Sequence, residues 1–364
     1  MGLCASVVSL ALKSSLLAWY RRNRRDLPWR RTADAYRIWV SEVMLQQTMV
    51  QAVVPYYQAF LERFPTVERL AAASEDGVLA LWSGLGYYRR ARNLHAGAKH
   101  LVRQGGQFPR TLEAALEVPG VGRYTAAAVL SIAYGVALPV VDGNGRRVFA
   151  RLFALRGARG RSDRTFGVLA AQWLDPGSPG DWNQALMELG ATVCTPRSPG
   201  CSHCPVRGHC RALAEGAVAR LPERRPRRRP VKVAVAAAVI ERGGRLLLVR
   251  RREGKLLGRM WEVPQTSLDG RGSPDLAREL EERHGLRVAP GALLGQVQHA
   301  ITYRRIQIEI RSARLLSGPP PDPARFRFVR RGELAGLPIS SMTRKIVAST
   351  GAARGRTGDK RRLP

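Results

Sequence analysis

The chain has 364 residues, in which 60 Lys and Arg outnumber 28 Asp and Glu and give a formal net charge of +32. The length suggests about two domains, and a hydrophobic content of 45% is enough to bury sizeable cores. An arginine-rich proteome would supply part of the positive charge, but the field also favours a nucleic acid over a membrane or an acidic protein as partner. No apolar run approaches the roughly 20 residues of a membrane-spanning helix. We expect a cytoplasmic monomer, associated with the nucleoid if the source is bacterial.

The N-terminal segment is apolar, but it lacks a basic start and is interrupted by Lys13. We therefore expect its Leu16–Tyr20 stretch to belong to the first folded helix rather than to a signal peptide. Apolar residues at three- and four-residue spacing, with Gly and Pro breaks, predict further helices up to residue 220. Trp39–Leu45 is one of them, and a second follows Thr111, whose hydroxyl is placed to cap it. Residues 1–220 are thus predicted to form an all-α domain.

Three segments of this domain carry side chains suited to chemistry or DNA binding. Glu42 lies in SEVMLQQT, where it is either a solvated helix residue or an acid whose pKa is raised by apolar neighbours. Gly120 and Gly122 lie between two helical patterns, in VPGVGRYT, where free backbone N–H groups can face a phosphate, although many glycine hairpins only connect helices. Asp142 begins an Asp-Gly pair, which is most often just a turn.

Four cysteines near the end of this domain follow the spacing C-x6-C-x2-C-x5-C, in a loop that spans residues 194–210. They are Cys194, Cys201, Cys204 and Cys210. Such crowding in a cytosolic chain favours metal ligation over disulfides. The spacing alone leaves a single zinc ion and an iron–sulfur cluster open. Cys4 lies outside the set, and we expect it to be a small buried hydrophobe.

Residues 221–232 contain five Arg and three Pro, which predicts an extended linker. Beyond it, Val231–Ile240 and Arg245–Arg250 are predicted to be two strands joined by a tight Gly-Gly turn. Ser273-Pro274-Asp275 is predicted to start a helix, with Ser273 as the cap and the proline in the first turn. Alternating isoleucines at 306, 308 and 310 predict another strand. Residues 233–350 therefore form an α+β domain, and 351–364 are expected to be a disordered basic tail.

Taken together, these motifs resemble the MutY family of the endonuclease III (helix-hairpin-helix) glycosylase superfamily, over most of the chain. The resemblance implies that the four cysteines hold a [4Fe–4S] cluster with a structural or DNA-sensing role. It also implies that Glu42 is the general acid/base that protonates adenine. Asp142 stabilises or captures the sugar cation, and Asn144 supports it.

The same resemblance assigns further residues. Tyr124 stands where bifunctional endonuclease III-like enzymes carry a lysine, so we expect hydrolysis without β-lyase strand cleavage. Trp29 is expected to line the adenine pocket, although plain core packing is the alternative for Trp29 and for Tyr88. The remaining DNA or substrate contacts are Arg30 and Gln184 at the adenine, and four residues that would fill the gap left by the flipped base: Gln47, Thr48, Leu85 and Tyr87.

The C-terminal domain resembles the Nudix fold, but its metal-binding box is degraded. The first box glutamate falls on Gly270 and the last on Arg283, so we do not expect pyrophosphate hydrolysis. In the family this domain recognises 8-oxoguanine. Here the corresponding loop keeps a hydroxyl at Thr302 and has Tyr303 in place of histidine. The expected partner is double-stranded DNA with adenine opposite 8-oxoguanine or guanine.

Three other functions are compatible with parts of the sequence. A helix-hairpin-helix glycosylase of the endonuclease III kind is disfavoured by Tyr124 and by the Nudix-like domain. One of the thymine-mismatch kind is disfavoured by Glu42. A non-enzymatic iron–sulfur DNA-binding protein would need neither Glu42 nor Asp142. A Nudix hydrolase fused to a DNA-binding domain is disfavoured by the degraded box.

Overall fold

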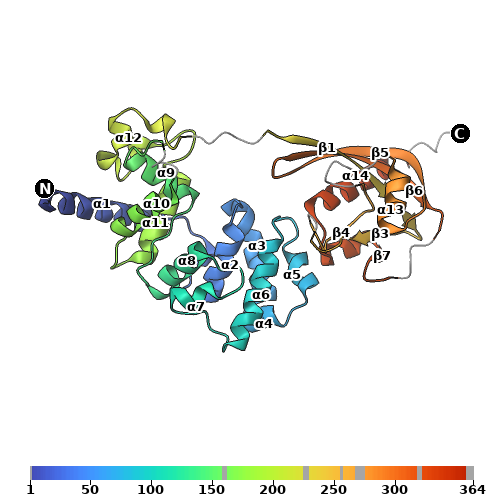
Figure 1. The fold of residues 1–364 in the computed structure, drawn as a ribbon, viewed down its shortest axis with the longest axis horizontal. Helices are drawn as coiled ribbons and strands as arrows, with labels where there is room; N and C mark the ends of the chain where they lie inside the picture. Colours follow the sequence, from blue (N-terminus) through green and yellow to red (C-terminus); the bar gives the residue numbers. More distant parts are fainter. Residues whose placement is uncertain are drawn as a thin grey trace. The chain divides into compact units, whose positions relative to one another are not determined.

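The computed structural model describes residues 2–157, 162–223, 229–254, 257–266, 275–317 and 322–357 (Figure 1). Contacts between residues group the chain into two compact units. The first contains Met1–Ala72 and Arg92–Pro226, and the second contains Ala73–Ala91 and Arg227–Pro364. A short piece of the helical half, Ala73–Ala91, therefore packs with the C-terminal residues, which the composition of the linker could not indicate.

The first unit is helical, and no strand occurs among its described residues. Of the helices in the N-terminal half, α5 and the first residues of α6 belong to the second unit. The helices are α1 Gly2–Asn23, α2 Ala35–Leu45, α3 Val50–Arg63, α4 Val67–Ala71, α5 Glu75–Leu81, α6 Arg89–Arg103, α7 Leu112–Leu116, α8 Arg123–Tyr134, α9 Gly143–Leu152, α10 Asp163–Trp173, α11 Pro179–Thr192 and α12 Arg211–Ala214. The predicted all-α character of this half is confirmed, as are the predicted first helix and the helix over Trp39–Leu45.

Several helix starts follow directly from side-chain caps in the sequence. Asp34 accepts a hydrogen bond from the Arg37 amide at the start of α2, and Thr111 accepts one from the Ala114 amide at the start of α7, as predicted. Such bonds satisfy amides that have no partner within the helix. Asp142 caps α9 in the same way. That aspartate therefore has a structural role in addition to any chemical one.

Helix α2 is the innermost helix of this unit, because nearly every one of its side chains is buried. Helices α3 and α8 pack against it. A separate core joins α1, α9, α10 and α11 through large side chains such as Tyr20, Phe149 and Trp182. Helix α11 approaches α8 so closely that a Cβ at Gly180 would lie 2.7 Å from the Ser131 carbonyl oxygen. Only glycine fits at that crossing.

The second unit contains two sheets and the helices α13 Leu276–His284 and α14 Ser341–Thr357. One sheet has the strand order β1-β6-β5, in which the central strand β6 runs parallel to β1 and antiparallel to β5. In the other sheet, β3 pairs with β2, β4 and β7. The strand bounds are β1 Val231–Val239, β2 Glu241–Arg242, β3 Arg245–Arg250, β4 Trp261–Glu262, β5 Val288–Ile301, β6 Arg304–Leu315 and β7 Phe326–Val329. The predicted α+β class is confirmed.

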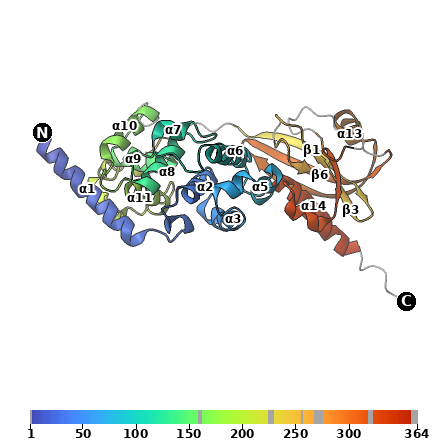
Figure 2. The ribbon, with the colours of Figure 1, turned by 90° about the horizontal axis from the view of Figure 1, so that it is seen from below.

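The two helices cover opposite faces of these sheets, as Figure 2 shows. Met342 and Ile346 of α14 pack in one core with Ile306 and the alternate inward residues of β6. Leu276 and Leu280 of α13 pack in another core with residues of β1 and β3. The alternation predicted for the isoleucines of β6 is thus confirmed, because all three point into the first core.

Two details of the sequence-based prediction for this unit were wrong. The predicted pair of strands breaks at Ile240: the Gly243-Gly244 turn joins β2 to β3, whereas β1 pairs with β6 in the other sheet. The long-range pairing with β6 buries the alternate side chains of β1, which a local turn signal cannot specify. Helix α13 is capped by Asp275, whose side chain accepts from the amides of Ala277 and Arg278. Ser273, the predicted cap, lies outside the described residues.

The predicted disordered tail was wrong over its first part, because α14 continues through Gly351 to Thr357. The first turns of α14 pack in the core and nucleate the helix, and each residue added to an existing helix gains a backbone hydrogen bond. Residues 358–364 lie outside the described part of the chain.

The predicted linker is also only partly described, because residues 224–228 lie outside the described part. Val231 and Lys232, which the composition assigns to the linker, instead begin β1. Cys4 falls within α1, but its side chain is not described.

Among the described residues, no helix has both the length and the apolar character that crossing a membrane requires.

We expect Gly180→Ala to destabilise the protein by about 2 kcal/mol or more, because the new methyl group would meet backbone atoms of α8 that cannot move aside. For a unit of this size that corresponds to a fall in melting temperature of roughly 4–8 °C. Gly167→Ala is the matched control: it lies in α10, with nothing within 4 Å of the added Cβ. Thermal unfolding of both variants checks this, and equal melting temperatures would contradict the close crossing of α8 and α11.

Candidate active site

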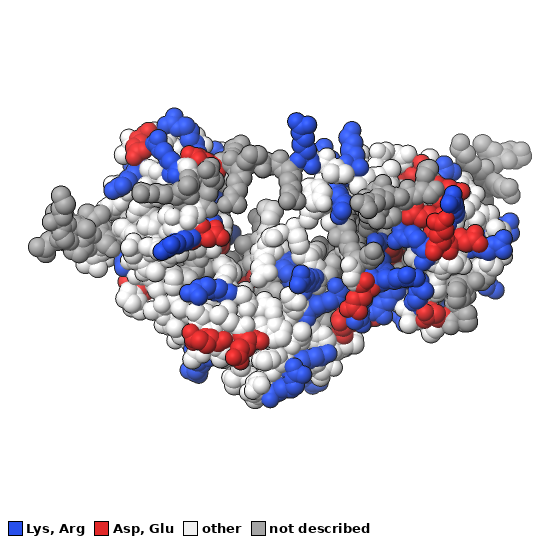
Figure 3. All heavy atoms as spheres, in the orientation of Figure 1, with Lys and Arg blue, Asp and Glu red and all other residues white. Residues whose placement is uncertain are grey.

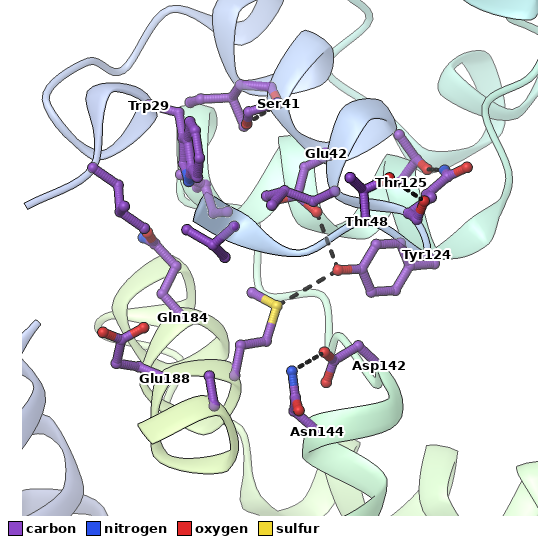
Figure 4. Close-up of a pocket in the computed structure, with 18 of the residues that line it drawn as sticks. Trp29, Ser41, Glu42, Thr48, Tyr124, Thr125, Asp142, Asn144, Gln184 and Glu188 are labelled. Atoms are coloured by element: carbon purple, nitrogen blue, oxygen red, sulfur yellow. Dashed lines mark hydrogen bonds between the residues drawn. The ribbon is translucent and has the colours of Figure 1, made fainter. Parts of the chain in front are cut away.

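The first unit contains a cavity of about 680 Å³ between α2, α8, α9 and α11. Figure 4 shows that the predicted acid and the predicted aspartate approach it from different helices. Most of the residues predicted from the sequence to act on DNA line this one cavity: Trp29, Arg30, Glu42, Gln47, Thr48, Gly120, Gly122, Tyr124, Asp142, Asn144 and Gln184. Segments that are far apart in the sequence therefore meet around a single space large enough for a nucleobase.

Glu42 is the carboxyl group with the most unusual environment in this cavity. It lies on the buried helix α2 and is only 5% exposed. Burial raises its pKa from the ordinary value of 4.5 to about 7, against the opposing effect of a hydrogen bond from Tyr124; the nearby charge of Asp142 raises it further. The raised pKa expected from the apolar neighbours of Glu42 is confirmed. The side chain can hold a proton near neutral pH.

The Tyr124 hydroxyl lies between two groups of the cavity wall. It donates to Glu42 Oε2 at 3.1 Å and has Met187 Sδ 3.5 Å away as a second acceptor (Figure 4). Burial and the nearby carboxyl groups raise the pKa of Tyr124 well above 10. The phenol is therefore neutral and donates its proton without losing it.

Asp142 lies at the start of α9, with both carboxylate oxygens engaged. Oδ1 accepts from the Gly145 amide at 2.6 Å, and Oδ2 accepts from Asn144 Nδ2 at 3.0 Å. Burial raises the pKa of Asp142, while these donors and Arg147 oppose that rise. Hydrogen bonds to both oxygens favour the ionised form. Asn144 thus contacts Asp142 directly, as the family resemblance implies.

A second layer of contacts fixes the segment that delivers Asp142. Asn183 of α11 is buried; its Oδ1 accepts from the Val140 amide at 3.1 Å and its Nδ2 donates to the Leu138 carbonyl at 2.9 Å. Arg147 donates to Asn144 Oδ1 at 2.8 Å and to the Cys194 carbonyl at 2.7 Å. The chain is thus fixed both before Asp142, at residues 138–140, and after it, at residues 144–147.

One wall of the cavity depends on an acidic residue that sequence reasoning missed. Glu188 is completely buried on α11 and binds Arg25 and Arg30 at 2.7 and 2.8 Å. These two arginines lower its pKa to about 2 despite the burial. Glu188 therefore holds the Leu27–Arg30 segment in place. A charged residue among the apolar neighbours of α11 was the signal that could have revealed it.

Trp29 and Gln184 also lie on this wall. Trp29 is buried and packs edge-to-face against Tyr57, with ring centroids 5.3 Å apart, while one part of it lines the cavity. Both alternatives weighed for Trp29, core packing and pocket lining, therefore apply at once. Gln184 is anchored by a bond from its amide to the Gly180 carbonyl at 3.3 Å.

The rim of the cavity is formed by the loop after α2 and by the glycine hairpin before α8. Gln47 is exposed and has a left-handed backbone, with φ 57°. Gly120 has φ 81°, and a Cβ there would lie 2.4 Å from Asn93 Cβ, so only glycine fits. Gly122 caps α8 and has open space around it. The hairpin amides at the start of α8 are thus placed where a phosphate can approach.

Three predicted DNA contacts belong to the second unit. Tyr87 is 48% exposed, whereas Leu85 is only 8% exposed. Of these two, the structure presents only Tyr87 to solvent, and the prediction that Leu85 fills a gap in the duplex is not supported by its burial. Thr302 lies at the turn between β5 and β6, with φ 54° and an exposed side chain.

The four cysteines of residues 194–210 surround one small cavity of about 30 Å³. All four are free thiols. Burial raises the pKa of Cys204 to about 11, and Arg151 donates to Cys194 Sγ at 3.3 Å. Among the described residues, no three His, Cys, Asp or Glu side chains are placed so that they could hold one metal ion together. The four thiols line one common space.

Basic side chains occur in separate groups on the face of the molecule shown in Figure 3, with acidic ones between them. On this face the positive charge is therefore divided among several groups rather than gathered in one stripe.

Comparison with known proteins identifies two family matches. Residues 40–167 match the HhH-GPD superfamily of base excision DNA repair proteins, and residues 235–349 match the NUDIX domain. Among solved structures, a thermostable thymine-DNA glycosylase superposes with a TM-score of 0.53 at 29% identity, covering 58% of this chain and 99% of that one. The helical unit thus has the fold of a DNA glycosylase.

Relatives of known function match beyond the helical unit. The adenine DNA glycosylase of Homo sapiens is 37% identical over 92% of this chain and 73% of its own length. That of Mycolicibacterium smegmatis is 46% identical over 58% of this chain and 73% of its own length. A match of this extent, together with both domain matches, shows that the chain belongs to the adenine DNA glycosylase family of base-excision repair enzymes.

Proposed function

We propose that this chain excises adenine from double-stranded DNA in which it is mispaired with 8-oxoguanine or guanine, by hydrolysing the N-glycosidic bond without cutting the strand. The observation that carries the proposal is the pairing, in one cavity, of a buried acid at Glu42 with a hydrogen-bonded carboxylate at Asp142. The names of the relatives support adenine as the base.

Departure of the base is the first step, and Glu42 is suited to assist it. A pKa of about 7 leaves a large share of Glu42 protonated at neutral pH. The proton passes to a ring nitrogen of adenine while the electron pair of the breaking C–N bond moves onto the base. General acids of this kind contribute about 10²–10⁴-fold to a rate.

The sugar then carries positive charge, and Asp142 supplies the opposing anion. Its two hydrogen-bonded oxygens stay fixed while the charge develops, so little reorganisation is needed. Water completes the reaction by adding to the sugar carbon, and its proton returns to the Glu42 carboxylate. The two carboxyl groups thus have different roles because their surroundings differ.

Strand cleavage by a lyase requires an amine that attacks the sugar carbon and forms a Schiff base. In this chain a neutral phenol, Tyr124, occupies the corresponding position. No lysine is among the described residues that line the cavity. These features support a monofunctional enzyme.

The four cysteines fit a [4Fe–4S] cluster better than a single zinc ion. Zinc needs sulfurs at about 2.3 Å from one point, whereas in a four-iron cluster each thiolate binds its own iron. The four thiols line one small cavity, and the match to the HhH-GPD superfamily supports the cluster rather than zinc. Cys194, Cys201, Cys204 and Cys210 would hold the cluster, which when bound supplies a closed, redox-capable structural centre and no open site for substrate.

The C-terminal domain is proposed to read the base opposite adenine. Its Nudix-like helix α13 is not equipped for Mg²⁺ chemistry, because Glu279 is buried and paired with Arg283 at 3.2 Å, and Arg283 itself replaces a box glutamate. Gly270, at the position of the first box glutamate, lies outside the described residues. The exposed Thr302 hydroxyl is the proposed contact to the lesion strand.

The substrate assignment predicts single-turnover release of adenine opposite 8-oxoguanine and opposite guanine, fastest from the first, and little from adenine opposite thymine. It also predicts no strand breaks unless alkali is added, because no amine is available at position 124. Gel analysis of labelled duplexes measures both. Excision of thymine or of oxidised pyrimidines at a comparable rate would overturn the assignment.

The role of Glu42 predicts that the single-turnover rate falls as pH rises through about 7, because the acid must be protonated and burial has raised its pKa from 4.5. Glu42→Gln should slow release by about 10²–10⁴-fold while mismatch binding persists. Tyr124→Phe removes a bond that favours the carboxylate, so it should move the falling limb to higher pH. A rate that rises through pH 7, or an active Glu42→Gln variant, would remove Glu42 from the role.

The cluster assignment predicts that protein purified without oxygen contains about four iron and four sulfide per chain, and no stoichiometric zinc. Cys204→Ser should lower the iron content, whereas Ser202→Ala, a neighbour in the same loop, should not. Elemental analysis checks both variants. One zinc per chain with negligible iron would contradict the proposal.

A further inference from the structure

The loop between α5 and α6 has a backbone that its sequence alone would not favour. Gly84 and Gly86 have φ 118° and 72°, and Tyr87 has φ 49°. A left-handed backbone at a residue with a Cβ is unfavourable and persists only where the surroundings impose it. The residues around the loop must therefore hold Tyr87 in this conformation.

Arg90, in the first turn of α6, contacts the loop from inside. Its guanidinium donates through Nη2 to the carbonyls of Leu85 and Gly86 at 3.4 and 3.2 Å. Trp82 Nε1 donates to the same Gly86 carbonyl at 3.2 Å. Arg90 is only 9% exposed, so its side chain is committed to the interior rather than to solvent or to a phosphate.

The guanidinium also lies against two aromatic rings. Its central carbon is 5.4 Å from the Trp82 ring centroid and 5.6 Å from that of Tyr87. Cation–π contacts at such distances are attractive, more so where water is excluded. Burial lowers the pKa of Arg90 to about 10, which leaves it charged at neutral pH. The same side chain thus holds the two carbonyls that precede Tyr87 and one side of the Tyr87 ring.

The next residue of the loop, Tyr88, has a different environment from Tyr87. Tyr88 is buried, and its hydroxyl donates to the Ile339 carbonyl at 3.4 Å. Ser83 donates to the same carbonyl and accepts a bond from Arg344 at 3.2 Å. Both ends of the loop are therefore fastened, while the Tyr87 ring remains half exposed.

We propose that Arg90 is a positioning residue that holds Tyr87 ready to enter the duplex before DNA binds. The inference rests on the proposed function, in which Tyr87 fills space beside the flipped adenine. Extruding a base costs a few kcal/mol, and a wedge that is already ordered does not add its own ordering cost. Arg90 therefore acts through Tyr87 and touches neither the adenine nor the sugar.

The test measures single-turnover adenine release at saturating enzyme for Tyr87→Ala, Arg90→Met, the double variant and Arg89→Met. Arg90→Met keeps the length of the side chain but removes the bonds to the carbonyls and the charge. Arg89→Met removes the same charge from the neighbouring, exposed position. Melting temperatures and duplex affinity are measured alongside, so that loss of folding or of phosphate binding is recognised separately.

We expect Tyr87→Ala and Arg90→Met each to slow release, on the order of tenfold, as for loss of about 1.4 kcal/mol of wedge contribution. The release rate of the double variant should lie within about twofold of the rate of Tyr87→Ala. The effects of two substitutions do not add when both residues act through the same structural element. Arg89→Met should keep the wild-type rate at saturation. Arg90→Lys, which keeps the charge but lacks the planar fork, should be slow as well.

Fluorescence of 2-aminopurine in place of the target adenine reports extrusion directly when Glu42→Gln is the background for all variants. We expect the rise in fluorescence to be slowed by Arg90→Met and by Tyr87→Ala alike. If Arg90→Met does not fold, Arg90→Lys carries the same comparison. A wild-type rate for a folded Arg90 variant, or multiplicative effects in the double variant, would overturn the inference. A wild-type rate for Tyr87→Ala would instead overturn the proposed entry of Tyr87 into the duplex.

Discussion

The burial of one carboxyl group, Glu42, is the constraint on which the rest of the site depends. A carboxyl group inside a protein favours its neutral form, because the charged form loses its hydration. Helix α2 is buried on nearly all sides, and Glu42 lines the cavity from this helix. The fold thereby prepares an acid that keeps its proton near neutral pH.

A second carboxyl group in the same cavity must behave differently, and its surroundings explain how it does. Asp142 is also buried, but it caps α9 and accepts bonds from Gly145 and Asn144. Fixed donors around a carboxylate replace the water that it lost. One position favours the acid and the other the anion, which is the division that cleavage of a glycosidic bond requires.

Close packing between helices fixes the position of the Asp142 carboxyl group in the cavity. A Cβ at Gly190 of α11 would lie 2.6 Å from Asn144 Cβ, so α9 and α11 meet with no space to spare. Arg147 joins Asn144 to the carbonyl of Cys194, the first of the four clustered cysteines. The support for Asp142 and the support for the cysteine loop are therefore one continuous structure.

Much of the site could be predicted because its key side chains lie in short, distinctive segments. The SEVMLQQT segment, the glycine hairpin and the four spaced cysteines can each be recognised from a short stretch of sequence. Residues of the first two line the large cavity, and the four cysteines line the small one. Glu188 was missed because its role depends on Arg25 and Arg30, more than 150 residues away in the sequence. The charge among apolar neighbours of α11 could indicate a buried acid, but nothing local identifies its two arginine partners.

The fold shows the same limit. The helices, the Thr111 cap and the alternating isoleucines of β6 follow from local chemistry, and these predictions are confirmed. The parallel pairing of β1 with β6 and the grouping of Ala73–Ala91 with the C-terminal residues depend on contacts between distant segments. The burial of Leu85 beside the exposed Tyr87 likewise depends on Arg90 and on the left-handed backbone, neither of which a motif specifies.

The most direct test of this account is the pKa of Glu42 itself, measured without DNA. Infrared difference spectra between the wild-type protein and Glu42→Gln, recorded across a range of pH, isolate the carbonyl stretch of this one carboxylic acid. The account predicts that the protonated band persists to neutral pH and disappears with a midpoint near 7. A midpoint near 4.5, the value of an ordinary exposed glutamate, would contradict it.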